Sequence, residues 1–413
     1  MAYPLRAIGK YWAKRLPATF HNGNSSPKLT FAMRKICVVI TARASFSRVK
    51  TVLTAIDAHP GLALQIVVAA SALSERYGNI LPHLKEENLP VTAVIPNMLD
   101  VENPTASAKT TGLAVIELAT FLANHSPDVV VTVADRFETI ATAIAAVNMN
   151  IPLAHIQGGE ITGNIDDRIR NSVSQLADLH FTATEKARNR LIAMGLPPHK
   201  IHFTGCPSID LIYHHKTIEF DPYKIYGGVG SQPDLNEPYL VVLQHPVTTE
   251  SNHSKWQIEN TLNALAPLDM PVIWFWPNAD AGTAGTAQGM RAFRERHFGL
   301  PFHFFRHMES RHFIQLLKNC ACFVGNSSVG IRECGALGVP AVNIGTRQCG
   351  RERSPNAVDC APGTTAIVSA VRYQLAHGHY PPSGLYGNGG AGQRIAEQLA
   401  TVPFILKKHI LSA

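Results

Sequence analysis

Acidic side chains gather in one loop near the middle of the sequence. Residues 155–170 read HIQGGEITGNIDDRIR and place Glu160, Asp166 and Asp167 within eight residues. Asp135 directly follows an earlier apolar run. Several carboxylates at one crevice suit general acid and base catalysis, because their surroundings can set their pKa values apart. The pattern therefore predicts proton transfer at this loop.

A second chemical signal is a glycine- and serine-rich turn. Residues 325–333 read GNSSVGIRE and follow an apolar run that is typical of a buried strand. Free backbone N–H groups at a strand-to-helix turn bind phosphate, and Ser327 and Ser328 add two hydroxyls. Glu333, about one helical turn further on, has the position of an acid that binds a ribose diol. The alternative is structural: Ser327 caps the helix and Glu333 is an ordinary first-turn acid.

Cationic and histidine side chains occur at three further strand ends. His245 precedes a proline that stops its strand, Arg43 follows the first strand, and Arg136 follows Asp135. An arginine at such a position can bind two phosphate oxygens at once. Arg347 and Arg351 lie after the last apolar run and are further candidates, although each of these arginines can instead form a simple ion pair.

The elements that must hold these residues alternate between strands and helices, which predicts parallel βαβ units. The expected strands of the first half are residues 34–41, 64–69, 128–133, 151–156, 179–182 and 201–203, with a loop at 42–47 and helices at 49–58, 111–124 and 185–194. Those of the second half are residues 239–243, 272–275, 302–305, 322–324 and 341–344. The fold class is therefore α/β, with two Rossmann-like doubly wound domains that face a cleft. Loops at the carboxyl ends of such strands hold the ligand.

Composition shifts predict the domain boundaries. Residues 33–211 form the first Rossmann-like domain and residues 238–390 the second, nucleotide-binding one. Between them, residues 212–237 are rich in Gly, Pro, Asp and Tyr without a regular period and are expected to be a linker. A C-terminal helix in residues 391–413, at about 393–410, is expected to return to the first domain.

The N-terminal segment accounts for most of the net charge. The chain of 413 residues carries +7, but residues 1–32 hold five cations and no acid, so the remainder carries only +2. A nucleic-acid partner is therefore not expected. We expect residues 1–32 to be a disordered extension, with Met33 as an alternative start, and a basic surface-binding or targeting helix is the other interpretation.

The bulk composition excludes two further classes. No apolar run approaches the roughly 20 residues of a membrane span. The seven cysteines are odd in number and lie mostly in expected core elements, which favours a reducing compartment, the cytoplasm, over a disulfide framework. Cys320 and Cys322 lack a second pair for a zinc site and are interpreted as packing residues, and no metal or cofactor is expected.

Taken together, eight collinear motifs resemble one family. They are DR at 135–136, HIQGGE at 155–160, IDDRIR at 165–170, GCPS at 205–208, QHPVTT at 244–249, PNADAG at 277–282, GNSS at 325–328 and GTRQCGRE at 345–352. In order and spacing they resemble the hydrolysing UDP-N-acetylglucosamine 2-epimerases. That family includes the bacterial sialic-acid enzymes and the epimerase half of the animal bifunctional enzyme.

The resemblance implies a GT-B-like pair of domains and a reaction in which UDP is eliminated and water added, giving UDP and free N-acetylmannosamine. It assigns Asp135, Glu160 and Asp167 to acid and base chemistry, with Asp166 as the alternative. The residues implied to hold the UDP-linked sugar are Arg43, Ser47, Arg136, His245, Asn278, Ser327, Ser328 and Glu333, with the uracil near Arg306, His307 and Met308. It also implies a homodimer or homotetramer.

Two positions depart from the family pattern. Ser45 stands where the family usually has an acidic residue, and Asn171 stands where it usually has a histidine. Both are expected to face the sugar, so a different sugar, such as a diacetamido sugar on UDP or GDP, remains open. Two other classes also remain open: a GT-B glycosyltransferase, which needs an acceptor before it releases UDP, and a nucleotide-sugar sensor that has lost activity.

Overall fold

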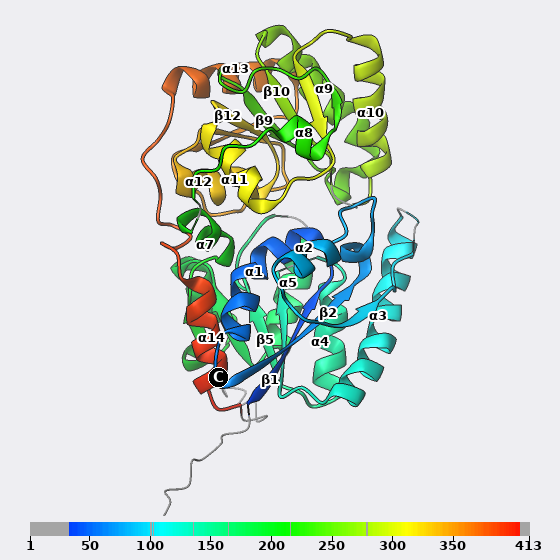
Figure 1. The fold of residues 1–413 in the computed structure, drawn as a ribbon, viewed down its shortest axis with the longest axis vertical. Coiled ribbons are helices and arrows are strands. Elements are labelled where there is room, and N and C mark those ends of the chain that lie inside the picture. The colour runs from blue at the N-terminus through cyan, green and yellow to red at the C-terminus, as the bar shows by residue number, and fades with distance from the viewer. Residues whose placement is uncertain are drawn as a thin grey trace, which may run out of the picture. The chain divides into compact units, whose positions relative to one another are not determined.

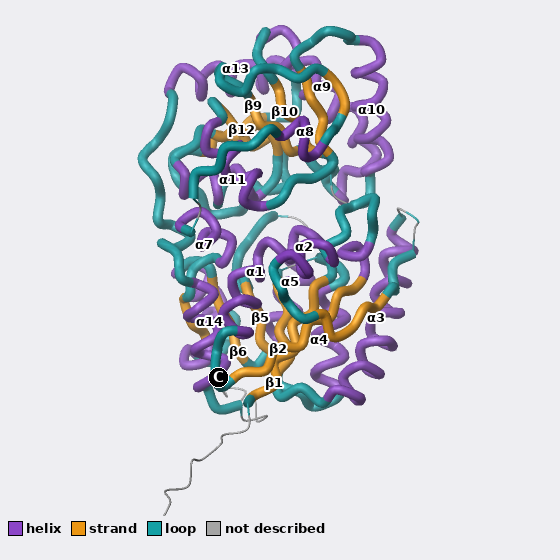
Figure 2. The backbone as a smooth tube through the Cα atoms, viewed as in Figure 1, coloured by secondary structure: helices purple, strands orange, loops and turns teal. Residues whose placement is uncertain are grey.

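The computed structural model describes residues 33–99, 101, 103–134, 136–163, 165–214, 216–277 and 280–404. Asp135, Asn278 and the N-terminal extension therefore lie outside the described residues. Helices surround two separate sheets, each of which forms the centre of one lobe (Figures 1 and 2).

The first lobe is built on seven parallel strands in the order β3-β2-β1-β4-β5-β6-β7. Their bounds are β1 Arg34–Ile40, β2 Leu62–Ala69, β3 Val91–Ile95, β4 Val129–Val133, β5 Leu153–Ile156, β6 Leu179–Thr182 and β7 Ile201–Phe203. The central strands are almost continuous runs of buried apolar residues, as expected for a parallel sheet covered on both faces.

Helices cover both faces of the first sheet. The helices of this lobe are α1 Arg43–Asp57, α2 Leu81–Glu86, α3 Pro104–His125, α4 Thr139–Asn148, α5 Asp166–Leu176, α6 Glu185–Ala193 and α7 Pro207–Tyr213. Side chains of α1 and α2 pack on one face, and side chains of α3, α4 and α5 pack on the other. The C-terminal helix α14, Ala391–Thr401, joins the first face beside α1, where Ile395 and Leu399 enter its core (Figure 1).

The second lobe repeats the arrangement with strand order β14-β13-β12-β9-β10-β11-β8. The strands are β8 Val229–Gly230, β9 Leu240–Leu243, β10 Val272–Phe275, β11 Phe302–Phe305, β12 Cys322–Gly325, β13 Ala341–Ile344 and β14 Ala357–Cys360. The helices are α8 Pro222–Tyr226, α9 Ser254–Leu265, α10 Thr283–Arg296, α11 Ser310–Asn319, α12 Glu333–Leu337 and α13 Thr364–His377. Apolar residues of α9, α10 and α13 pack on one face, and those of α11 and α12 on the other.

Both sheets reverse their winding direction once. The reversal falls between β1 and β4 in the first lobe and between β9 and β12 in the second. Ligands of doubly wound sheets bind outside the carboxyl ends of the strands at this switch point. The loops after these four strands carry Arg43, Arg136, His245 and Ser327, so the topology brings the predicted binding residues to the two places where a ligand is expected.

Three stretches differ in detail from the elements that the sequence predicts, and residues 405–413 of the expected C-terminal helix lie outside the described residues. Most of the expected loop at 42–47 forms the first turn of α1, which begins at Arg43. Polar residues are common in a first helical turn, because its backbone N–H groups have no partner within the helix. The expected linker at 212–237 contains α8 and β8, and β8 pairs antiparallel with β11. The helix expected at 393–410 ends at Thr401, because Pro403 cannot continue it. Among the described residues no helix is long and apolar enough to cross a membrane.

Candidate active site

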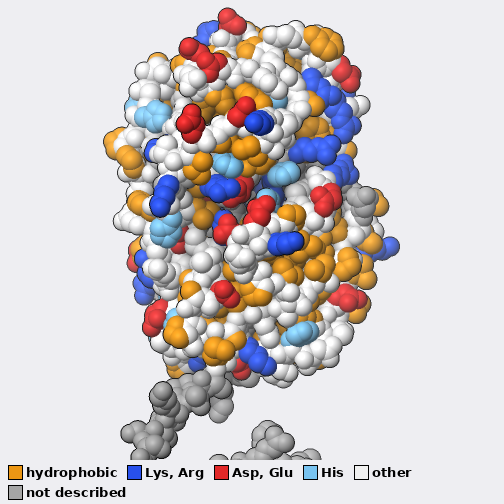
Figure 3. All heavy atoms as spheres, in the orientation of Figure 1, with side chains coloured by type: hydrophobic (Ala, Val, Ile, Leu, Met, Phe, Trp, Pro, Cys, Tyr) orange, Lys and Arg blue, Asp and Glu red, His pale blue; other side chains and the backbone are white. Residues whose placement is uncertain are grey.

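Loops from both switch points line one cleft between the lobes. Its space, including the part open to solvent, is about 1320 Å³. Figure 3 shows basic, acidic and histidine side chains gathered in the hollow between the lobes. Seven predicted binding residues share the lining: Arg43, Ser47, His245, Met308, Ser327, Ser328 and Glu333.

The serine turn is fixed by a close approach of two strands. Gly325 has φ of +144°, and a Cβ there would lie 2.2 Å from the carbonyl oxygen of Leu243, so only glycine fits. The next residue, Asn326, accepts a hydrogen bond from the His245 backbone N–H at 2.7 Å and donates one to the His245 carbonyl at 2.8 Å. The loops after β9 and β12 are thereby held in a fixed relation.

The side chains of Ser327 and Ser328 make different hydrogen bonds beside the cleft. The Ser327 Oγ accepts a hydrogen bond from the Val329 N–H at 3.4 Å, which is the capping role anticipated as the structural alternative. Ser328 lies one residue further on and receives an Arg48 N–H at 3.5 Å from the opposite lobe. Both serines also line the cleft, so capping and ligand binding are compatible here.

Positive charge in this part of the cleft comes from arginines rather than from the histidine. Burial lowers the pKa of Arg43 to about 10, which leaves it protonated at neutral pH. Burial, followed by the nearby Arg347 charge, lowers the pKa of His245 to about 3, so its imidazole is neutral. Arg347 also lines the cleft and donates to the Asn326 carbonyl at 3.3 Å. Two cations beside the hydroxyls of Ser327 and Ser328 can bind a diphosphate.

Glu333 begins α12 and lines the same cleft. One of its carboxylate oxygens, Oε2, is buried and finds no hydrogen-bond partner among the described residues. Buried polar atoms are normally paired, and an unpaired one calls for a partner that the protein itself does not supply. A pair of ribose hydroxyls would provide such donors.

Part of the cleft lining is aromatic. Phe275 and Phe313 meet edge to face, with ring centroids 5.1 Å apart, and Met308 lies with them in the lining. The residue after Met308 is fixed by a hydrogen bond, since the Glu309 N–H donates to the Tyr226 hydroxyl at 3.2 Å. The family resemblance implies that the base of the nucleotide lies near Met308.

Arg136 does not line the cleft itself but belongs to a charged cluster beside His245. It donates to Glu138 at 3.2 Å and, across the lobes, to Asp280 at 3.1 Å. Burial alone would lower the pKa of Arg136, but Glu138 and Asp280 outweigh it and raise the pKa, with a smaller contribution from Asp166. Arg136 and Arg347 likewise keep the pKa of buried Asp280 low. Asp166 therefore lies within electrostatic reach of this cluster.

Asp167 braces its own loop. Its Oδ1 accepts hydrogen bonds from the Thr162 N–H and hydroxyl, both at 2.8 Å, and its Oδ2 accepts one from the Gly163 N–H at 2.8 Å. An ion pair with Arg170 completes the set. Burial would raise the pKa of Asp167, but these hydrogen bonds outweigh it and lower the pKa. The side chain does not line the cleft.

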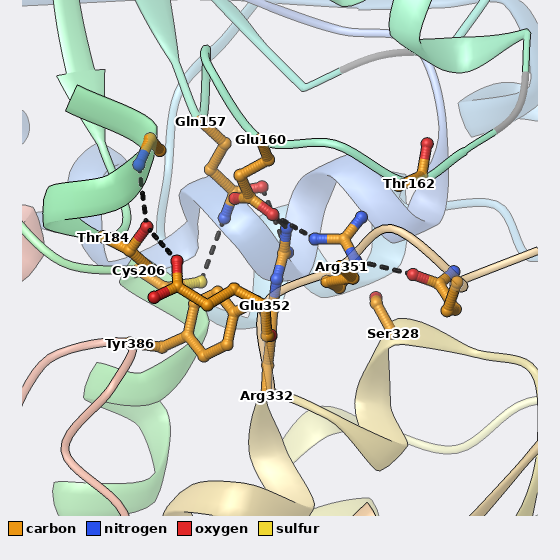
Figure 4. Close-up of polar contacts among 12 residues, drawn as sticks. Gln157, Glu160, Thr162, Thr184, Cys206, Ser328, Arg332, Arg351, Glu352 and Tyr386 are labelled. Atoms are coloured by element: carbon orange, nitrogen blue, oxygen red, sulfur yellow. Dashed lines mark hydrogen bonds and ion pairs between the residues drawn. The ribbon is translucent and has the colours of Figure 1, made fainter. Parts of the chain in front are cut away.

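Glu160 also lies away from the cleft lining, in a buried polar network between the lobes (Figure 4). Arg332 donates to its Oε2 at 2.6 Å, and Arg351 forms a second ion pair with the same oxygen. Burial would raise the pKa of Glu160, but the two guanidiniums outweigh it and lower the pKa to about 2. Glu160 is therefore ionised and already paired at neutral pH.

Sequence reasoning missed two residues that organise the site, Asp280 and Arg332, whereas Arg351 was a candidate for phosphate contact or for the kind of ion pair that it forms here. Asp280 belongs to the motif at 277–282, from which only Asn278 was predicted to bind the substrate. A carboxylate that closely follows a strand end was the signal that could have identified Asp280. No local signal marks the partners of Arg332 and Arg351, which lie 172 and 191 positions from Glu160.

The two departures from the family pattern have different surroundings. Ser45 is buried in the first turn of α1, between Ala44 and Phe46, which line the cleft. Asn171 lies on α5, and its Oδ1 is buried without a hydrogen-bond partner among the described residues.

Two doubly wound lobes with facing switch points define a protein of GT-B-like fold. Solved structures agree with this class. The crystal structure of the Methanocaldococcus jannaschii UDP-GlcNAc 2-epimerase in complex with UDP-GlcNAc and UDP superposes with a TM-score of 0.74 at 18% identity, covering 88% of this chain and 99% of that chain.

Sequence comparisons narrow the class to a family. The family described as UDP-N-acetylglucosamine 2-epimerase matches residues 54–400, and the chain belongs to this family. A Legionella pneumophila protein named UDP-N,N'-diacetylbacillosamine 2-epimerase (hydrolyzing) is 31% identical over 90% of this chain and 97% of its own length. A Neisseria meningitidis serogroup B protein named UDP-N-acetylglucosamine 2-epimerase is 30% identical over 90% of this chain and 95% of its own length.

Proposed function

We propose that the protein is a hydrolysing 2-epimerase. It converts UDP-N-acetylglucosamine, or a close nucleotide-linked N-acetylamino sugar, to UDP and a free sugar of the N-acetylmannosamine type. The observation that carries the proposal is the cleft in which Ser327, Ser328, Arg43 and Arg347 surround one space and a charged, acid-containing cluster adjoins it at His245.

The nucleotide half of the substrate fits the second lobe. The diphosphate lies against Ser327 and Ser328 with Arg43 opposite, because charge-assisted hydrogen bonds to phosphate are strongest from arginine and from free backbone N–H groups. Glu333 accepts the ribose hydroxyls. The base lies near Met308, against the aromatic end of the cleft.

The sugar then reaches the cluster of His245, Arg136 and Asp280. In the first step a carboxylate removes the C2 proton while the bond between C1 and the diphosphate oxygen breaks, which gives a glycal and UDP. In the second step water adds its oxygen to C1, and a proton returns to C2 on the opposite face. The product is the free 2-epimer, and no oxidant or metal is consumed.

For proton transfer we propose Asp135 and Asp166. Asp166 starts α5 within electrostatic reach of Arg136, and Asp135 immediately precedes Arg136 in the sequence. The acid and base roles that the family resemblance implies for Asp167 and Glu160 stay part of the proposal: Arg332 and Arg351 hold the Glu160 Oε2, whereas its Oε1 has no hydrogen-bond partner among the described residues. Separate acid and base groups are needed, since the proton leaves one face and returns to the other.

Two kinds of sugar are candidates for the substrate. The similarity to a protein named for UDP-N,N'-diacetylbacillosamine supports a diacetamido sugar as the second candidate substrate. Asn171 departs from the family pattern, and its buried Oδ1 has no hydrogen-bond partner among the described residues; we propose that it contacts the sugar. We also propose a homodimer or homotetramer, which light scattering on the purified protein tests.

Release of UDP tests the proposal. Purified protein is incubated separately with UDP-N-acetylglucosamine, with UDP-linked diacetamido sugars and with their GDP counterparts, and free nucleotide diphosphate is measured without any acceptor. Release of UDP with formation of the free 2-epimer is the expected result. Release only after an acceptor is added would identify a glycosyltransferase instead, and tight UDP binding without turnover of any sugar would identify a sensor.

A further inference from the structure

Glu160 lines a second, smaller cavity that shares no lining residue with the cleft. Its space, including the part open to solvent, is about 260 Å³. We call it the rear cavity; its lining includes Glu160, Thr184, Ala187, Glu352 and Tyr386, and most of the residues around it are polar or charged. Polar cavities hold water, because water finds hydrogen-bond partners in their walls.

The two carboxylate oxygens of Glu160 have different surroundings. Oε2 is held by Arg332 at 2.6 Å and by a second ion pair with Arg351. Oε1 is buried and has no hydrogen-bond partner among the described residues. Buried polar atoms are normally paired, and water in the rear cavity is a partner that this polar lining can hold. Oε1 is therefore the oxygen of Glu160 that is available to gain and lose a proton.

Glu352 lines the same cavity and is fixed there by two hydrogen bonds. Its Oε2 accepts one from the Thr184 hydroxyl at 2.8 Å, and its backbone carbonyl accepts one from the Tyr386 hydroxyl at 2.6 Å. The Thr184 oxygen itself accepts a hydrogen bond from the Ala187 N–H at 3.1 Å, as the N-cap of α6. These contacts hold a second carboxylate at the rear cavity.

The two carboxylates of the rear cavity differ in their exposure to solvent. Glu160 is 5% exposed, whereas Glu352 is only partly buried. In Figure 4 the Glu352 carboxylate points at the Thr184 hydroxyl, on the opposite side of Glu160 from Ser328. A proton that moves from Glu160 to Glu352 therefore passes towards solvent on the side away from the serine turn of the cleft.

The charges around Glu160 make the release of a proton favourable. Burial would raise the pKa of Glu160, but Arg332 and Arg351 outweigh it and lower the pKa to about 2. A protonated Glu160 leaves two buried guanidiniums without their counterion, which is costly. A nucleotide sugar bound in the cleft excludes solvent on that side during the reaction. The proton of Glu160 therefore needs another path to solvent.

We propose that the rear cavity is the path by which Glu160 exchanges its proton with solvent, and that Glu352 relays this proton. The inference rests on the proposed function, in which Glu160 takes part in proton transfer. The Oε1–H of Glu160 gives its proton to water in the rear cavity, that water gives one of its protons to the Glu352 carboxylate, and Glu352 releases it to solvent. The reverse sequence brings a proton in. Each step breaks one O–H bond and forms another, so no oxidant or reductant is needed.

Three variants test the proposal. Glu352→Gln keeps the shape of the side chain and an oxygen that accepts the Thr184 hydrogen bond, but it cannot carry the proton. Glu352→Ala opens room for formate, a small carboxylate that can replace the missing one. Glu352→Asp keeps the carboxylate on a shorter side chain. The matched control is Glu185→Gln, which neutralises an exposed carboxylate next to Thr184, at the start of α6 and outside the rear cavity.

Steady-state release of UDP gives kcat, and calorimetry gives the Kd for UDP. Because Glu352 acts through Glu160, Glu352→Gln should lower kcat about tenfold or more and leave the Kd for UDP unchanged. Formate should restore the kcat of Glu352→Ala in proportion to its concentration, whereas sodium chloride at the same ionic strength should not. Glu352→Asp should lose less activity than Glu352→Gln, and Glu185→Gln should match the wild type. If Glu352→Gln fails to fold, the formate dependence of Glu352→Ala and Glu352→Asp decides.

Two results would overturn the proposal. One is a kcat of Glu352→Gln that equals that of the Glu185→Gln control. The other is a loss of kcat that formate does not restore, or that comes with an equal loss of UDP affinity, since Glu352 would then only join the two lobes through Thr184. Failure of the wild-type protein to release UDP from any nucleotide sugar would instead refute the proposed function.

Discussion

Replacing Glu333 by alanine should uncouple stability from nucleotide binding. The Glu333 Oε2 is buried without a hydrogen-bond partner among the described residues, so the unliganded protein gains nothing from that atom. An unsatisfied buried polar atom costs about 1–3 kcal/mol, which offsets the packing lost on truncation. The free energy of unfolding of the unliganded variant should therefore equal or exceed that of the wild type.

The same substitution should weaken UDP binding substantially. A hydrogen bond to a charged group contributes about 1.5–3 kcal/mol, and a loss of about 2 kcal/mol raises Kd about 30-fold. At a UDP concentration of 100 times the wild-type Kd, the ligand stabilises the wild type by about 2.7 kcal/mol but the variant by only about 0.9 kcal/mol.

Thermal unfolding with and without UDP measures both effects in one assay. The control is Glu295→Ala, which removes an exposed carboxylate on α10 and should change neither the Tm nor its shift with UDP. A lower Tm for unliganded Glu333→Ala with a full UDP shift would refute the assignment, because it would make Glu333 a structural first-turn acid.

Three further predictions concern the diphosphate end of the cleft. Arg43→Ala should raise the KM for substrate by about 10-fold or more, since a charged hydrogen bond contributes about 1.5–3 kcal/mol. Steady-state kinetics at two ionic strengths measure the change in KM. An equal rise of KM in Arg43→Lys would contradict a simple charge role. Because the pKa of His245 lies at about 3, His245→Gln should leave any midpoint between pH 5 and 8 in the kcat/KM profile unmoved, and a midpoint that disappears would contradict that value. Gly325→Ala should lower the free energy of unfolding by more than about 1 kcal/mol, because the new Cβ would lie 2.2 Å from the Leu243 carbonyl oxygen. Urea unfolding measures this loss. An unchanged urea midpoint would contradict the close approach of Gly325 to Leu243.

Acid stability provides an independent check on the Glu160 ion pairs. The folded-state pKa of Glu160, about 2, lies below its ordinary value, so its contribution to stability is present above the unfolded-state pKa. That contribution is lost as the pH falls from the unfolded pKa of about 4.3 through 2. Unfolding at pH 2–5 should therefore be less pH-dependent in Glu160→Gln than in wild type, as measured by urea midpoints; equal slopes would contradict the shift.

The sequence was sufficient to predict the fold because its signals are local. Apolar runs such as Val129–Val133 identify buried strands, and the residues that follow them fall at the carboxyl ends of those strands. Arg43, His245 and Ser327 were therefore found from their strand-end positions alone, before the strand order was known. The family resemblance supplied the nature of the ligand, which no strand pattern contains.

The remaining features depend on long-range contacts. The loop sequence around Glu160 predicts a catalytic acid, but it contains no sign of the ion pairs that Glu160 forms with Arg332 and Arg351 of the other lobe. Likewise, β8 pairs with the edge strand β11, which lies far away in the sequence. The composition around β8 alone therefore predicts a linker and not a strand. Such partners are separated by many residues in the chain, and no local period records them.

The most direct test of the central claim is the reaction in D₂O, followed by proton NMR with UDP-N-acetylglucosamine or the best diacetamido substrate. Elimination and hydration predict free UDP and a free 2-epimer that carries deuterium at C2, in equal amounts. A nucleotide-linked epimer as the final product, or a free sugar that retains its original C2 proton, would contradict the account.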